Sequence, residues 1–171
     1  SKQEQIKIFE KELEVLCKEV TDIRKSGAIL LQKKISSALK DLNFLDARFE
    51  VEHRTLEQFT SNGKDEMEFV VSMNPGEDLK PLGKVASGGE LSRIMLAVKS
   101  VFADSDNIET LIFDEIDVGI SGRTAQKVSE KMAVLGKKHQ IICITHLAQI
   151  AAMADSHYLI EKVSQKGITK T

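Results

Sequence analysis

Two short apolar runs in the sequence end in polar residues that could do chemistry. The run at 110–113 is followed by Asp114 and Glu115, and the run at 141–144 leads to His146. The carboxyl ends of parallel strands meet at one edge of a sheet, so we expect these side chains to share a crevice. Neighbouring carboxylates on an extended chain point to opposite sides. One could therefore hold a hydrated divalent cation while the other polarises a water molecule.

A third polar segment, Ser87-Gly88-Gly89-Glu90, opens an amphipathic stretch. Ser87 as an N-cap with Glu90 three residues later is a capping box, which accounts for these two residues without any function. It does not account for Gly88 and Gly89, because each glycine in a helix costs about 1 kcal/mol relative to alanine. Glycines at this position expose backbone N–H groups at the positive end of a helix, which is an anion site suited to phosphate.

The N-terminal part of the chain, which precedes these segments, has the pattern of a long helix. Apolar residues recur there at alternating spacings of three and four, the seam of a coiled coil: Ile6, Phe9, Leu13, Leu16, Val20 and Ile23. We therefore predict the end of a coiled coil over residues 1–25 and a separate lobe over 26–171. Ser26-Gly27 interrupts the pattern, and a second amphipathic stretch follows, which favours a packed helical hairpin.

The middle of the chain alternates apolar and polar residues in two segments, 47–52 and 67–73. The segment between them contains Asn62-Gly63, a strong turn signal. We predict two antiparallel strands joined by a long connection.

After Pro81 the pattern becomes that of an α/β protein. Amphipathic helices alternate with fully apolar strands, at 90–102, 110–113, 124–135 and 141–144. Continuous apolar strands of this kind predict a parallel sheet that helices cover on both faces. Residues 157–163 could supply a further strand.

Composition excludes several classes of protein. The 171 residues are 42% apolar and 29% charged, which is typical of a folded domain. Lys and Arg number 24 against 26 Asp and Glu, so a strongly basic DNA-wrapping module is excluded, although a local basic patch is not. No apolar run approaches the roughly 20 residues that cross a bilayer. The two cysteines, Cys17 and Cys143, lie in unlike contexts, which favours a reducing cytoplasm over a disulfide framework.

In this order the polar segments resemble the C-terminal half of an ATP-binding-cassette (ABC) ATPase head. Residues 86–90 resemble the signature motif, residues 111–115 the Walker B motif with its catalytic glutamate, and His146 the switch histidine. The coiled-coil end before them narrows the resemblance to the branch in which a coiled coil splits the ATPase, the chromosome-maintenance (SMC) proteins and their relatives. Within that branch, residues 74–77, 86–93, 114–122 and 145–149 resemble a bacterial DNA-repair family.

The resemblance implies a role for each matching residue. Asp114 would hold Mg²⁺, through water, and Glu115 would orient and deprotonate the attacking water. His146 would sense the γ-phosphate of ATP. The signature residues Ser87, Gly88, Gly89 and Glu90 would contact ATP bound to another protomer. The D-loop region would comprise Asp117, Gly119 and Ser121.

The sequence departs from the pattern in ways that limit what this chain does by itself. Ala86 replaces the common Leu of the signature motif, and Ser121 stands at the place of the usual D-loop Asp. There is no Walker A motif, since the segment from Gly76 to Lys84 has the wrong spacing. We expect a fragment of a longer protein that is inactive without the N-terminal half of its ATPase head.

For the whole protein, the resemblance implies ATP hydrolysis between two heads, in the service of DNA double-strand-break repair. ATP and Mg²⁺ would be the cofactors, with the N-terminal half-head, a second copy and DNA as partners. The expected location is the cytoplasm, on the nucleoid, with no membrane partner.

Two other functions fit parts of the sequence. A metal-dependent hydrolase would use Asp114, Glu115, Asp117 and His146, and should bind Mn²⁺ or Zn²⁺ tightly without nucleotide. A coiled-coil interaction module without catalysis would be indifferent to changes at Ser87, Glu115 and His146. The hydrolase would leave the turn at Ser87, Gly88 and Gly89 unexplained.

Overall fold

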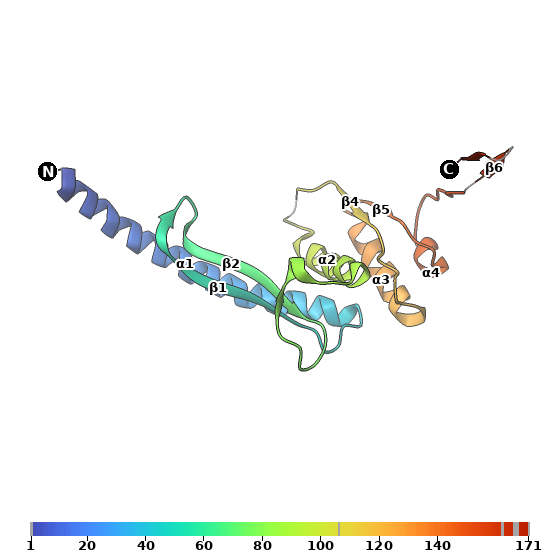
Figure 1. Cartoon of the computed structure of the whole chain (residues 1–171), viewed down its shortest axis with the longest axis horizontal. Helices are drawn as coiled ribbons and strands as arrows, with labels where there is room; N and C mark the ends of the chain where they lie inside the picture. The colour runs from blue at the N-terminus through green and yellow to red at the C-terminus, as the bar shows by residue number, and fades with distance from the viewer. Residues whose placement is uncertain (1, 106, 162, 166–167, 171) are drawn as a thin grey trace.

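A long helix, a β-hairpin beside it and a small α/β lobe at its C-terminal end make up the chain (Figure 1). The computed structural model describes residues 2–105, 107–161, 163–165 and 168–170. No helix in these ranges combines the length and apolar character that crossing a membrane requires.

Helix α1 (Lys2–Asp41) is a single helix of 40 residues, so the predicted break at Ser26-Gly27 and the helical hairpin are wrong. One glycine costs about 1 kcal/mol, which does not end a helix that continues on both sides. Ser26 adapts to the helix by donating its hydroxyl to the carbonyl oxygen of Asp22 at 2.9 Å.

The apolar seam of α1 is exposed on the surface. Its six apolar residues, Ile6 to Ile23, have 37–72% of their surface exposed. Ile35, Ala38 and Leu39 in the last turns of α1 belong to the core of the lobe, whereas Cys17 is buried outside that core. An exposed apolar seam on a helix that leads out of a folded lobe is typical of one helix of a coiled coil. The domain boundary at residue 25 stays a prediction, since the helix passes through it unchanged.

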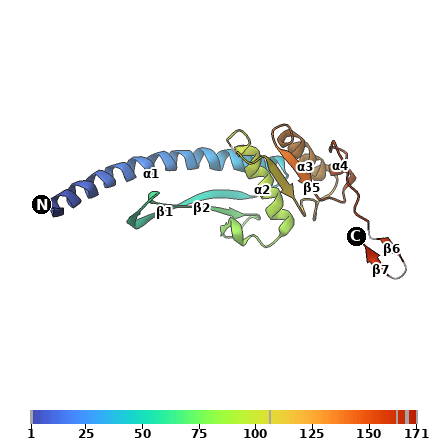
Figure 2. The ribbon, with the colours of Figure 1, turned by 90° about the horizontal axis from the view of Figure 1, so that it is seen from above.

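The predicted antiparallel pair is confirmed, but the long connection is wrong, because the two strands extend into the expected loop and only Ser61 and Asn62 separate them. Strands β1 (Arg48–Thr60) and β2 (Gly63–Ser72) form a hairpin that is longer than predicted, and the short β3 (Lys80–Pro81) pairs with β2. The hairpin runs alongside α1 away from the lobe, in both views (Figures 1 and 2).

Asp65 fastens this hairpin to α1. Its buried carboxylate accepts hydrogen bonds from Thr21 Oγ1 at 2.8 Å and Arg24 Nη1 at 3.1 Å, and lies 2.6 Å from His53 Nε2. Burial by itself raises the pKa of Asp65, but the bonds from His53, Thr21 and Arg24 outweigh it and lower the pKa. The carboxylate is therefore held charged at the contact between hairpin and helix.

The lobe contains two parallel strands, β4 (Thr110–Phe113) and β5 (Gln140–Cys143), which pair with Leu111 opposite Ile141. Helices α2 (Gly88–Phe102) and α3 (Gly122–Leu135) flank them, and a short α4 (Ala148–Ala151) follows. The core is shared by the end of α1, the base of the hairpin, α2, β4 and α3.

The parallel sheet is covered on one face only, contrary to the prediction. Leu111 and Phe113 are buried, whereas Ile112 is 67%, Ile142 46% and Ile144 52% exposed. The two strands have the fully apolar sequence that is typical of strands buried on both faces. Among the described residues, however, nothing packs on the second face of this sheet.

The chain ends in a separate hairpin of β6 (Val163–Gln165) and β7 (Ile168–Lys170). The strand expected at 157–163 is not formed over 157–161, and residue 162 lies outside the described residues.

Candidate functional site

The N-terminus of α2 lies at one edge of the lobe. Ser87 is its N-cap, and the serine Oγ accepts the backbone N–H of Glu90 at 3.3 Å, as the capping pattern predicts. Gly88 is exposed and Gly89 is buried. The two glycines therefore lie in different surroundings, and a side chain would meet different neighbours at each position.

Gly88 lies against the side chain of Glu115. A Cβ at Gly88 would overlap Oε2 of this glutamate, so the end of this exposed side chain would have to move aside. Glu115 itself follows β4 with a φ of +56°, a left-handed conformation that is unusual for a glutamate. Asp114 accepts the backbone N–H of Glu115 on its Oδ1 at 2.8 Å. The signature-like turn and the end of β4 are thus in direct contact within one chain.

Gly89 packs under the turn that follows Glu115. Its Cβ would lie 3.0 Å from the carbonyl oxygen of Val118 and 3.1 Å from Nη1 of Arg93. Arg93 is buried, and its Nη1 donates to the carbonyl oxygens of Val118 at 2.8 Å and Ile116 at 3.3 Å. Its guanidinium also lies over the ring of Phe44 at 5.4 Å. Arg93 therefore fixes the 115–118 turn to α2.

The positioning role of Arg93 does not follow from the sequence motifs. The available signal was a charged residue on the same helical face as Gly89 and Ala97, both of which are buried. An arginine within a buried stripe requires acceptors in the protein interior.

Asp117 joins the same turn to the end of β5. Its Oδ2 accepts the hydroxyl of Thr145 at 2.5 Å and the backbone N–H of His146 at 2.8 Å, and it lies 3.1 Å from His146 Nδ1. Burial raises the pKa of Asp117, but the bonds from Thr145 and His146 together lower it below its usual value. The imidazole of His146 remains 74% exposed. Asp117 positions the histidine segment, a role that the D-loop assignment did not include.

Burial and two nearby carboxylates keep the Cys143 thiol protonated. Burial, followed by the charges of Asp117 and Asp114, raises the pKa of Cys143 to about 11. Cys143 is therefore a thiol, not a nucleophilic thiolate, near neutral pH. Cys17 and Cys143 are both free, in agreement with the expectation of no disulfide framework.

The rest of the D-loop region forms the exposed connection from Asp117 to α3. Gly119 has a φ of +74°, and Ser121 caps α3 without a side-chain hydrogen bond. Neither contacts Ser87, Glu115 or His146 through any hydrogen bond that the described residues make.

These contacts form one continuous rim. It runs from Ser87 and Gly88 to Glu115, along the turn to Asp117, and on to His146. Beside it, a groove of about 360 Å³ lies between α2 and β4, lined by Leu91, Met95, Ile112 and Asp114 among others. Within the described ranges no three His, Cys, Asp or Glu side chains are grouped to hold a metal.

Replacing Asp117 by asparagine should loosen the histidine segment and lower stability by about 1–3 kcal/mol, because buried donors lose their acceptor. A lowered pKa means that the carboxylate stabilises the fold above its unfolded pKa, near 3.9, and that this stabilisation is lost as pH falls below it. Thermal melts of the wild type and Asp117→Asn should therefore differ most at pH 7 and converge below about pH 4.

The exposed Asp46 offers a matched control. Asp46→Asn should leave the melting curve within about 0.5 kcal/mol of wild type at every pH. Equal effects of the two substitutions on the melting curve would show that Asp117 does not position the histidine segment.

The fold is similar to part of a solved Smc head domain. The crystal structure of the Smc head domain with a coiled coil and joint from Pyrococcus yayanosii matches 99% of this chain and 31% of its own, with a TM-score of 0.61 at 22% identity. The predicted fold class, the C-terminal half of an ABC-type head preceded by a coiled-coil end, is confirmed. No protein-family model matches the chain.

Curated relatives narrow the resemblance. The DNA repair protein RecN of Halalkalibacterium halodurans is 46% identical over 164 residues, which cover 94% of this chain and 29% of that protein. RecN of Bacillus subtilis is 42% identical over 176 residues, covering 94% and 31%. The resemblance to the C-terminal part of RecN that the ordered motifs indicate is confirmed. The chain spans less than a third of the length of these relatives.

Proposed function

We propose that this chain is the C-terminal lobe of an ATPase head in a RecN-like DNA double-strand-break repair protein. The observation that carries the proposal is the rim, where a glycine-bearing helix tip, the polar end of β4 and the histidine after β5 meet. Phosphoryl transfer depends on positioning and charge stabilisation, so dispersed groups can serve it once two copies bring their rims together.

Each residue of the rim has a part in this proposal. Glu115 orients the attacking water and accepts its proton, and His146 contacts the γ-phosphate. Ser87, Gly88, Gly89 and the start of α2 present the serine hydroxyl and backbone N–H groups to phosphate. Arg93 and Asp117 are positioning residues, since they hold the turn between the two strand ends.

Asp114 suits a Mg²⁺ ion that keeps most of its water. Its carboxylate is exposed at the rim and engaged by one hydrogen bond, from the N–H of Glu115. Mg²⁺ is commonly held by one or two carboxylates, water and substrate phosphates. The ion would supply charge neutralisation at the phosphates.

The missing phosphate-binding loop would come from the N-terminal half of the same head. We propose that this half covers the open face of the sheet at Ile112, Ile142 and Ile144, next to the groove between α2 and β4. Parallel strands are stable when both faces are covered, so this face needs a partner.

A second copy of the head would complete the site through ATP. In that dimer Ser87 faces the nucleotide of the other protomer, while Glu115 serves its own. The contact of Gly88 with Glu115 in the single chain would have to open to admit phosphate. DNA is the proposed partner of the whole protein, on the nucleoid in the cytoplasm.

Reconstitution tests this proposal. This chain alone should not hydrolyse ATP, whereas mixing or co-expressing it with the N-terminal half of the head should restore Mg²⁺-dependent ATP hydrolysis. Turnover by the chain alone that survives Glu115→Gln would overturn the assigned roles. Restored binding of the two halves without hydrolysis would favour an interaction module instead.

A further inference from the structure

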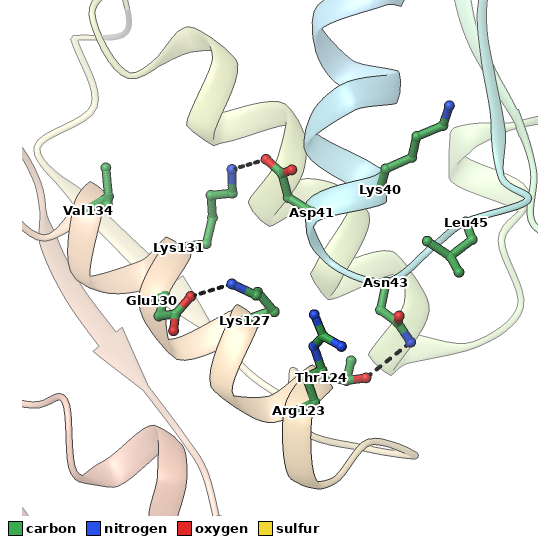
Figure 3. Close-up of a pocket in the computed structure, with 10 residues that line it drawn as sticks. All are labelled: Lys40, Asp41, Asn43, Leu45, Arg123, Thr124, Lys127, Glu130, Lys131 and Val134. Atoms are coloured by element: carbon green, nitrogen blue, oxygen red, sulfur yellow. Dashed lines mark hydrogen bonds and ion pairs between the residues drawn. The ribbon is translucent and has the colours of Figure 1, made fainter.

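A second hollow lies away from the rim, between the C-terminal end of α1 and helix α3. Its volume is about 510 Å³ (Figure 3). Arg123, Lys127 and Lys131 line it from α3, and Asp41 and Asn43 face them from the end of α1. The Asn43 amide donates to the Thr124 hydroxyl at 3.2 Å, which joins its two walls. We refer to this hollow as the α1–α3 groove.

The groove gathers positive charge in a chain that is acidic overall. Four basic residues line it, Arg123, Lys127, Lys131 and Lys40, against two acidic ones, while the whole chain has a formal charge of −2. Figure 3 shows the Arg123 guanidinium pointing from α3 toward the end of α1, and Lys40 reaching outward from the last turn of α1. Arg123 has no ion-pair partner within the described part of the chain.

The two acidic residues hold their lysines weakly. Lys127 pairs with Glu130 at 2.9 Å and Lys131 with Asp41 at 2.9 Å, and the carboxylates are 44% and 58% exposed. Exposed pairs of this kind contribute about 0–1 kcal/mol. A DNA phosphodiester carries one negative charge, as each of these carboxylates does, so the phosphates of a duplex can compete for both lysines.

The lining also indicates which phosphate compound fits. Arg123, Lys127 and Lys131 are spaced four residues apart, so they form a row with about 6 Å between successive residues along the helix axis. No aromatic residue is among the described side chains that line the groove, so a base would have nothing on which to stack. A row of cations without a base platform suits a duplex backbone better than a nucleotide or a single strand.

We propose that the α1–α3 groove binds the phosphate backbone of double-stranded DNA. This assigns a surface of the lobe to the DNA partner, and it rests on the proposed function for the identity of that partner. The site is separate from the ATP rim, because none of the groove residues contributes to the rim contacts.

Fluorescence anisotropy of a labelled 30-base-pair duplex, titrated with the 171-residue chain at several KCl concentrations, tests the proposal. The double variant Arg123→Gln/Lys127→Gln should bind at least about 5-fold more weakly at low salt. Its salt slope should be smaller by about 1–2, since each lost phosphate contact removes about 0.9. Lys18→Gln/Lys25→Gln is the matched control, because both lysines are exposed on the distant part of α1 and the charge change is the same.

The outcomes separate the alternatives. The proposal is overturned if the wild-type chain does not bind the duplex, if the control weakens binding as much as the groove variant, or if a few millimolar inorganic phosphate displaces the duplex at constant ionic strength. Thermal melts check that the groove variant is folded. ATP hydrolysis by the reconstituted head should be unchanged in the groove variant without DNA, so failure of the groove leaves the ATPase proposal standing.

Discussion

Replacing Glu115 by glutamine is expected to lower ATP hydrolysis by the reconstituted head by about 10²–10⁴-fold, the usual contribution of a general base. Glutamine keeps the size of the side chain beside Gly88 but cannot accept the proton of the attacking water. Nucleotide-driven dimers should persist and become longer-lived, because ATP is bound and not consumed. Initial rates of phosphate release and size-exclusion chromatography with ATP measure the two effects.

Glu109 provides the control for this substitution. It is exposed and lies before β4, at the opposite end of the strand from Glu115. Glu109→Gln makes the same chemical change and should leave the rate within about 2-fold of wild type. A Glu115→Gln head that hydrolyses ATP as fast as the Glu109→Gln head would rule out Glu115 as the base.

Replacing Gly89 by alanine should be the second most damaging change. The new Cβ would lie 3.0 Å from both the Cβ and the carbonyl oxygen of Val118, so the 115–118 turn must move. Overpacking of this kind costs about 1–3 kcal/mol. The same movement displaces Glu115, so hydrolysis by the reconstituted head should fall more than about 10-fold, in line with the sensitivity of catalysis to small displacements.

Gly27 is the natural comparison, since the substitution is identical. It lies within α1, and a Cβ there would meet nothing within 4 Å. Gly27→Ala should therefore raise stability by about 1 kcal/mol through helix propensity, with no effect on hydrolysis. Urea unfolding and ATPase rates of the two variants give the contrast, and a Gly89→Ala protein that matches Gly27→Ala would contradict the packing of α2 against the turn.

The local patterns predicted most elements because each depends on nearby residues. The hairpin, both apolar strands, and helices α2 and α3 follow from periodicity, and Ser87 caps α2 as its spacing predicts. The break at Ser26-Gly27 was wrong because the helix-lowering effect of one glycine is small compared with a helix of 40 residues.

The tertiary contacts of the rim could not be predicted in the same way. That Gly88 accommodates Glu115, and that Arg93 bridges α2 and the turn, depends on how α2 docks on β4. The sequence places Asp117 after a strand, but only the fold brings it to Thr145 and His146. The prediction that both faces of the sheet are covered came from the fully apolar strands, but Ile112 and Ile142 are exposed among the described residues.

Complementation between two inactive heads tests the proposal that two copies share each ATP site. Reconstituted Ser87→Arg and Glu115→Gln heads are each expected to be inactive. In an equal mixture, half of the two-fold dimers have one intact site, so about a quarter of the wild-type rate should return. The double variant mixed with either single variant should recover nothing. Failure of the two single variants to restore any hydrolysis together would place Ser87 and Glu115 in the same protomer's site and contradict the shared-site account.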